Sequence, residues 1–134
     1  MIYTSYYANV KNLPESIIPI SIAGKAPEGY KGLEYKRLAP KYGFFSEWKK
    51  SGDNEYYTKC FKEQVLKPLN IFEVLGELVQ LRNSVEGGSD KKICLICYEK
   101  PDDFCHRHLV AEWLRSNKVP CREWDKDRWG WDGE

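Results

Sequence analysis

The sequence predicts an α/β domain: a small, partly parallel sheet with helices on both faces, in a Rossmann-like three-layer arrangement. Three observations favour this fold class. β-prone segments lie at both ends of the chain, segments with a helical spacing of apolar residues lie between them, and a strand–turn–helix pattern lies near the C-terminus. A chain of 134 residues is long enough to bury one ordinary core. We therefore expect a single domain over residues 1–134, with an irregular, Trp-rich tail at about 125–134.

Four segments are predicted to be strands: residues 2–7, 17–22, 93–98 and 119–124. The first alternates apolar with small polar residues, as a half-buried strand does, and the third is a continuous apolar run, typical of a central strand. Pro19 lies inside the second segment and has no N–H to donate. It therefore predicts either an edge strand or restricted pairing around that residue.

Four further segments are predicted to be helices: residues 43–50, 55–69, 71–83 and 105–117. In the second of these, Tyr57, Phe61 and Val65 follow one another at intervals of four residues, which places them on one helical face. Pro68 is expected to end that helix, because proline cannot continue the hydrogen-bond ladder.

Composition excludes several classes of protein. Lys and Arg total 21 against 20 for Asp and Glu, so the net charge of +1 does not support nonspecific binding of nucleic acid. The apolar stretches are too short to span a membrane, and the first ten residues lack the pattern of a signal peptide. A cytoplasmic location is therefore expected, and an odd number of cysteines, 5, favours free thiols over a disulfide framework.

Ionisable and nucleophilic side chains gather in residues 104–114 (FCHRHLVAEWL), where the predicted strand 93–98 and a turn lead into the last helix. The first turn of a helix presents unpaired N–H groups and a positive dipole end, and so it favours an anion. Cys105 and His106 are the candidate catalytic residues, a thiol of lowered pKa beside a proton shuttle. Arg107 is the expected anion contact, with His108 nearby. The alternative is a structural Arg107, paired with a carboxylate of the preceding turn, Glu99 or Asp103.

A second candidate region is the glycine-rich loop at residues 23–33, AGKAPEGYKGL. Lys25 within it suits contact with an anionic ligand, and either Tyr30 or Tyr7 could stack on a ring. The loop has neither the spacing of a P-loop nor that of a dinucleotide turn. A simple surface loop therefore remains the alternative.

The Cys94–Cys97 pair has C-x-x-C spacing, which raises redox and zinc alternatives. Residues three apart on a strand point to opposite faces of the sheet, so these two thiols are not expected to meet. A zinc site from Cys94, Cys97, Cys105 and His108 would require that residues 93–98 are not a strand. We therefore expect no metal and no cofactor.

The segment ICLICYEKPDDFCHRHLVAEWL resembles the C-terminal signature of the small proteins grouped as domain of unknown function 488 (DUF488). YTSYYAN, SIAGKAPEGYKG, YKRLAP and FFSEWK resemble the short bacterial and phage branch of that family, so the resemblance covers nearly the whole chain. It implies an α/β fold and a ligand site around Cys105, His106 and Arg107. Longer members carry an Asp-x-Arg turn where this chain has residues 21–25, SIAGK, so no role of that arginine is carried over.

Two classes of function follow. The first is an anion site, for a nucleotide or a phosphorylated small molecule, at the junction around Cys105, His106 and Arg107, with the nucleotide or nucleobase as a substrate to be processed. The second is a non-catalytic module that sequesters a nucleotide signal or binds nucleic acid or a protein. Trp124, Trp129 and Trp131 of the Trp-rich tail favour the second class, because exposed tryptophans serve as stacking platforms or interface anchors. The alternative is that this tail folds back and covers the core.

Overall fold

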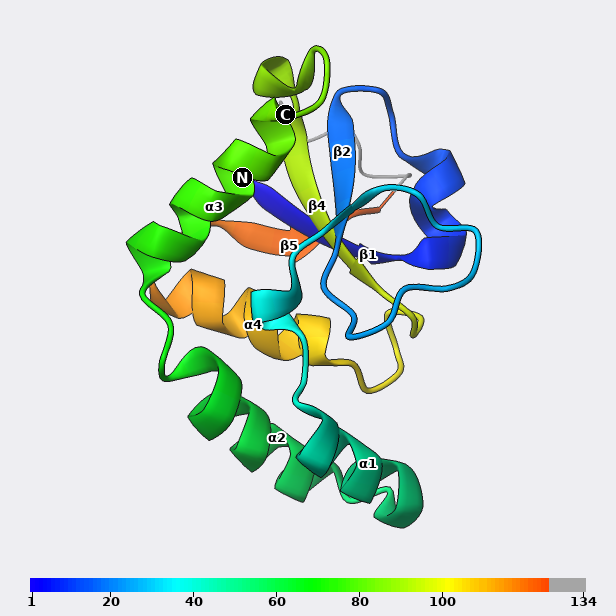
Figure 1. The fold of residues 1–134 in the computed structure, drawn as a ribbon, viewed down its shortest axis with the longest axis vertical. Coiled ribbons are helices and arrows are strands. Elements are labelled where there is room, and N and C mark those ends of the chain that lie inside the picture. The colour runs from blue at the N-terminus through cyan, green and yellow to red at the C-terminus, as the bar shows by residue number, and fades with distance from the viewer. Residues whose placement is uncertain (126–134) are drawn as a thin grey trace.

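The fold, a computed structural model in which residues 1–125 are described, is built on one sheet of five strands in the order β3-β2-β4-β1-β5 (Figure 1). All the pairings in this sheet are parallel, so the structure goes further than the partly parallel sheet that was predicted. The strands are β1 (Ile2–Tyr6), β2 (Ile17–Ser21), β3 (Leu33–Glu34), β4 (Lys92–Cys97) and β5 (Cys121–Glu123).

The two faces of the sheet are covered differently. Ile93 and Leu95 of β4 belong to a core that includes residues of all four α-helices, whereas Cys94 and Ile96 pack with Trp124 and residues of the 3-10 helix η1 (Tyr7–Asn12) on the opposite face. These are the three layers of an α/β domain. The helices are α1 (Tyr42–Ser51), α2 (Asn54–Phe61), α3 (Ile71–Asn83) and α4 (His106–Ser116).

Most of the predicted elements are confirmed, with two differences that have physical causes. β2 lies between β3 and β4, so the predicted edge position is wrong. β3 pairs with β2 only at Ile20 and Ser21, however, so pairing on that side begins after Pro19, as the other prediction required. The predicted helix 55–69 divides into α2 and a π-helical turn, η3 (Lys62–Leu66), which ends the helix just before Pro68.

The predicted tail falls largely outside the described residues, and Trp129 and Trp131 with it. Trp124, by contrast, is only 4% exposed and seals the core face opposite the α-helices. This residue is therefore part of the core and not an exposed anchor. Within residues 1–125, no helix has both the length and the apolar character that a membrane span requires.

Candidate functional site

A cavity of about 910 Å³ opens beyond the carboxyl ends of β2 and β4, where parallel α/β sheets bind their ligands. The loop after β2 lines it, as do α1, the loop after β4 and the start of α4. The lining residues are Ala23, Gly24, Lys25, Pro40, Tyr42, Phe45, Trp48, Lys49, Gly52, Tyr57, Cys97, Tyr98, Glu99, Phe104, Cys105 and His106.

The junction between β4 and α4 has the predicted geometry. A turn closed by the bond from the Asp103 N–H to the Lys100 carbonyl, 3.0 Å long, leads into α4. Cys105 is the N-cap residue with extended backbone, and the helix begins at His106. The prediction that a helix begins within two residues of Cys105, directly after β4, is therefore confirmed.

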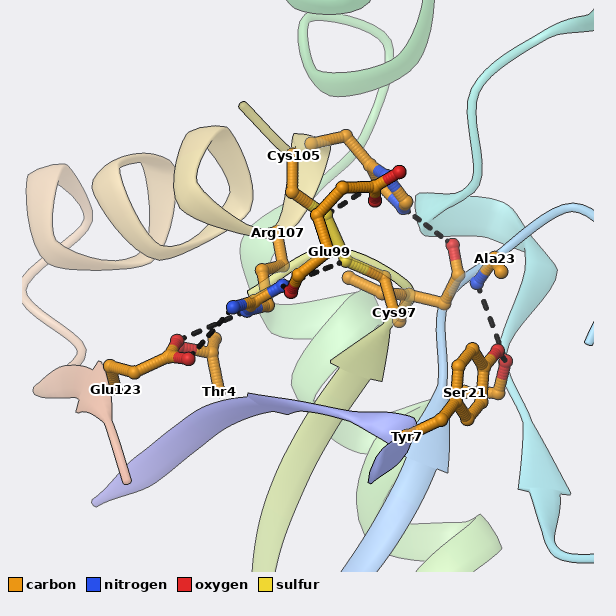
Figure 2. Close-up of a disulfide and its surroundings, with 11 residues drawn as sticks. Thr4, Tyr7, Ser21, Ala23, Cys97, Glu99, Cys105, Arg107 and Glu123 are labelled. Carbon is orange, nitrogen blue, oxygen red and sulfur yellow. Dashed lines mark hydrogen bonds and ion pairs between the residues drawn. A yellow bond between two sulfur atoms is a disulfide. The ribbon is translucent and has the colours of Figure 1, made fainter. Parts of the chain in front are cut away.

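Cys97 and Cys105 form a disulfide across this junction (Figure 2). The expectation that the cysteines are free is wrong for these two, and holds for Cys60, Cys94 and Cys121. Cys97 is the last residue of β4, and its side chain faces the cavity, whereas Cys94 belongs to the opposite face. Cys94 and Cys97 therefore do not meet, as predicted, and Cys105 is the partner that sequence spacing did not suggest.

His106 is a buried residue of the cavity lining, and each of its ring nitrogens faces a neighbouring group. Its Nε2 lies 2.7 Å from the Ile22 carbonyl oxygen, and its Nδ1 lies 4.0 Å from the Sγ of Cys105. Burial lowers the pKa of His106 to about 4, a shift that the nearby positive charge of Arg107 reinforces. The ring is therefore neutral at pH 7, donates from Nε2 to the carbonyl, and turns the lone pair of Nδ1 toward Cys105.

The Arg107 side chain is fully buried, is not part of the cavity lining, and points toward Glu123 (Figure 2). Its Nε and Nη2 donate to the two carboxylate oxygens of Glu123 at 3.1 and 2.8 Å. Its Nη1 donates to the Glu99 carbonyl oxygen at 2.5 Å and to the Sγ of Cys97 at 3.2 Å. These contacts occupy the fork that was predicted to bind a ligand, and Arg107 does not line the cavity, so they favour a positioning role for Arg107 over direct contact with an anion. The partner is Glu123, not the side chain of Glu99 or Asp103.

Two lysines and a group of aromatic rings form the rest of the cavity lining. Lys25 comes from the loop after β2, as predicted, and Lys49 from α1. The ring of Phe104 packs against Trp48 and Tyr57, at centroid distances of 5.7 and 5.1 Å. Burial raises the pKa of Tyr57 above its ordinary value, so its hydroxyl stays protonated at neutral pH.

The other predicted ligand residues lie elsewhere. Tyr7 and Tyr30 pack edge to face, 5.5 Å apart, with the core on the face of the sheet opposite the α-helices. Neither residue lines the cavity. Tyr98 does line it, and its ring packs against that of Tyr7. His108 is half-buried on α4 and does not line the cavity; burial lowers its pKa. Trp48, Phe104 and Tyr57 line the cavity, whereas Tyr7 and Tyr30 do not.

A family model described as the active DUF488-N3 subclade, DUF488-N3a, matches residues 4–118. The chain belongs to this family. Every residue that lines the cavity of this DUF488-N3 chain falls inside the matched span, so the cavity is part of the family domain. No curated protein and no solved structure matches the chain.

Three features of this DUF488-N3 site were missed by sequence reasoning. Cys97 was considered as half of a C-x-x-C pair and in a zinc set that the strand argued against, although its place at the end of the apolar run marked it as a residue at the carboxyl end of a strand. Lys49 and Trp48 lie on a short helix that is far from the junction in the sequence, and no sequence signal linked them to it. Glu123 reaches Arg107 from β5, across a strand order that the sequence does not reveal.

Proposed function

We propose that the cavity binds an anionic small molecule that carries a flat ring, of which a nucleotide is the simplest example. One observation carries the proposal: two lysines, an aromatic wall and the Cys97–Cys105 pair line the same cavity. Lys25 and Lys49 supply positive charge for a phosphate. The Trp48 and Phe104 rings offer flat apolar surface for a base.

The cavity volume also suits this class of ligand. Pockets for small molecules commonly span roughly 300–1,000 Å³ and are mostly apolar with a few polar groups, which matches a cavity of about 910 Å³. The groups that would react with a bound ligand are Cys105 and His106, which remain the candidate catalytic residues. Nδ1 of His106 lies 4.0 Å from the Cys105 sulfur and is unprotonated at pH 7, so once the disulfide is reduced it would be placed to accept the thiol proton.

The disulfide favours a second candidate, a binding module without catalysis. While Cys97 and Cys105 are joined, neither sulfur is a thiolate, and only ligand binding is open to the cavity. The two candidates differ in a direct observation. If ligand released from natively purified protein is recovered unchanged under reducing conditions, the binding module gains support, whereas turnover favours the enzyme.

The binding step is tested by calorimetric titration with AMP, adenosine and ribose 5-phosphate. We expect AMP to bind more tightly than either half. We also expect Lys25→Ala and Lys49→Ala each to weaken AMP binding roughly 10- to 100-fold, the usual effect of losing a charged hydrogen bond.

The matched controls are Lys31→Ala, in the same loop as Lys25, and Lys50→Ala, beside Lys49 on α1. Both control lysines are exposed and do not line the cavity, so their removal should leave AMP affinity unchanged. If neither cavity lysine matters, or if ribose 5-phosphate binds as well as AMP, the proposed function is wrong.

A further inference from the structure

We propose that, once the Cys97–Cys105 disulfide is reduced, the two sulfurs and the Nδ1 of His106 together bind one zinc-class divalent cation at the floor of the cavity. The potential ligand atoms of these three buried residues all lie within 4.8 Å of one another, and all three residues line the cavity. Thiolate and imidazole are the ligand types that zinc prefers. This inference does not depend on the nucleotide proposed above.

The orientation of His106 fits a metal ligand. A carbonyl oxygen only accepts, so the 2.7 Å contact between the Ile22 carbonyl and Nε2 places the proton of the neutral ring on Nε2. Nδ1 then carries the free lone pair, on the side of Cys105. Metal-ligating histidines are commonly held in this way, with the other ring nitrogen donating to a backbone carbonyl.

The distances require little adjustment on the histidine side. Tetrahedral zinc, with bonds of about 2.3 Å to sulfur and 2.0–2.1 Å to nitrogen, places a sulfur and a nitrogen ligand about 3.6 Å apart. The Sγ of Cys105 and the Nδ1 of His106 are 4.0 Å apart. The two sulfurs must separate to about 3.8 Å, and they can do so once the bond between them is broken.

The charges of the proposed cation site, which is buried, also balance. Two thiolates, a neutral imidazole and a divalent cation sum to zero, so no net charge is buried. Nη1 of Arg107 lies 3.2 Å from the Sγ of Cys97 and would donate to the thiolate as an outer partner, while its own charge is paired with Glu123. With three protein ligands, the fourth position faces the cavity, where water or the anionic group of a ligand can occupy it.

Reduction of the disulfide and binding of the cation both balance in atoms and electrons. Two molecules of a small monothiol supply two electrons and two protons to the disulfide and leave joined as their own disulfide. Cation binding then releases the two thiol protons of Cys97 and Cys105. This site revises the expectation of no metal. It also differs from the zinc set considered from sequence, because Cys94 lies on the other face of the sheet and His108 outside the cavity.

The test uses Co²⁺ as a spectroscopic stand-in for zinc, added without oxygen to reduced, full-length protein. We expect one equivalent to bind with an intense near-ultraviolet thiolate-to-cobalt band, and we expect no band in the oxidised protein. Cys97→Ser and Cys105→Ser should each weaken binding at least 100-fold, more than the 10- to 100-fold typical of an outer-shell change. Cys60→Ser, at a half-buried free cysteine outside the cavity, is the matched control and should bind as wild type does.

A second measurement on the wild-type chain covers the case in which a variant fails to fold. Added Zn²⁺ should protect Cys97 and Cys105 from alkylation, as mapped by mass spectrometry, and should leave the labelling of Cys60 unchanged. Absence of a thiolate-to-cobalt band in the reduced protein overturns the site. Equal alkylation of Cys97 and Cys105 with and without Zn²⁺ does the same.

Discussion

The pair of Arg107 and Glu123 offers the sharpest test of how the site is built, because its two members differ in their access to water. The Arg107 side chain is 0% exposed and that of Glu123 is 24% exposed. Replacing Glu123 with Gln leaves a buried guanidinium without its counter-charge. Replacing Arg107 with Met leaves a carboxylate that water can partly reach. Glu123→Gln should therefore destabilise the fold more than Arg107→Met.

The size of the effect follows from these contacts. Removing one member of a buried, hydrogen-bonded ion pair costs about 3–5 kcal/mol, and we expect Glu123→Gln to fall in this range. For a chain of 134 residues, an unfolding entropy of about 2.1 cal/mol/K per residue converts this loss into a Tm lowered by roughly 11–18 °C. Arg107→Met should cost about 2–4 kcal/mol, because Glu123 keeps some water and the bond from the Thr4 hydroxyl.

Urea unfolding of both single variants and of the double variant measures this coupling. The double variant should lose less stability than the two single losses combined, because it leaves no unpaired buried charge. The control is Arg37→Met, which breaks exposed ion pairs with Glu73 and Glu77 and should cost far less stability than either change at the buried pair. Strict additivity, or a loss below about 1 kcal/mol for Glu123→Gln, would refute the positioning role of Arg107.

Three further predictions concern stability and the thiols. Because the folded-state pKa of His106 is about 4 and that of an exposed histidine about 6.5, the metal-free protein should lose stability as pH falls from 6.5 to 4, by up to about 3 kcal/mol. Urea unfolding of His106→Gln across this range should show a smaller loss; the same pH dependence in both proteins would rule His106 out as its source. Gly88→Ala should destabilise the fold by about 1–3 kcal/mol, since its Cβ would lie 1.8 Å from a backbone oxygen. Gly76→Ala in α3, with open space around it, should stabilise by roughly 0.5–1 kcal/mol, and thermal melts of the two variants check both signs. Thiol titration in denaturant should detect 3 thiols in the oxidised chain and 5 after reduction, and equal counts would mean that Cys97 and Cys105 are not joined.

Local sequence patterns predicted the elements that frame the site. The spacing of apolar residues predicted the bounds of α3, Ile71–Asn83, correctly. In the structure this helix begins after the cap residue Asn70, whose side chain accepts from the Phe72 and Glu73 N–H groups. The apolar run of β4 and the turn before Cys105 were equally informative. These features depend on hydrogen bonds and spacings within a few residues, so a single sequence contains them.

The contacts that complete the site depend on residues that are remote in the sequence. Arg107 meets Glu123 because β5 lies beside β1, and Lys49 reaches the cavity because α1 packs near the start of α4. The anion role of Arg107 was predicted from its helix position and the fork of its guanidinium, and neither says which way a long side chain turns. The pairing of Cys97 with Cys105 joins a strand end to a helix start, and no spacing rule within either element predicts it.

The order of strands has a consequence for how the chain folds. Ile2 of β1 lies between Ile93 of β4 and Cys121 of β5, so β1 has no partner in the sheet until β4, far downstream in the sequence, has been synthesised. Closing such long loops costs entropy before any contact repays it, so assembly of the central sheet should be the slow step. Until then, the β-prone residues of β1 stay unpaired in the nascent chain and can associate with strands of other chains.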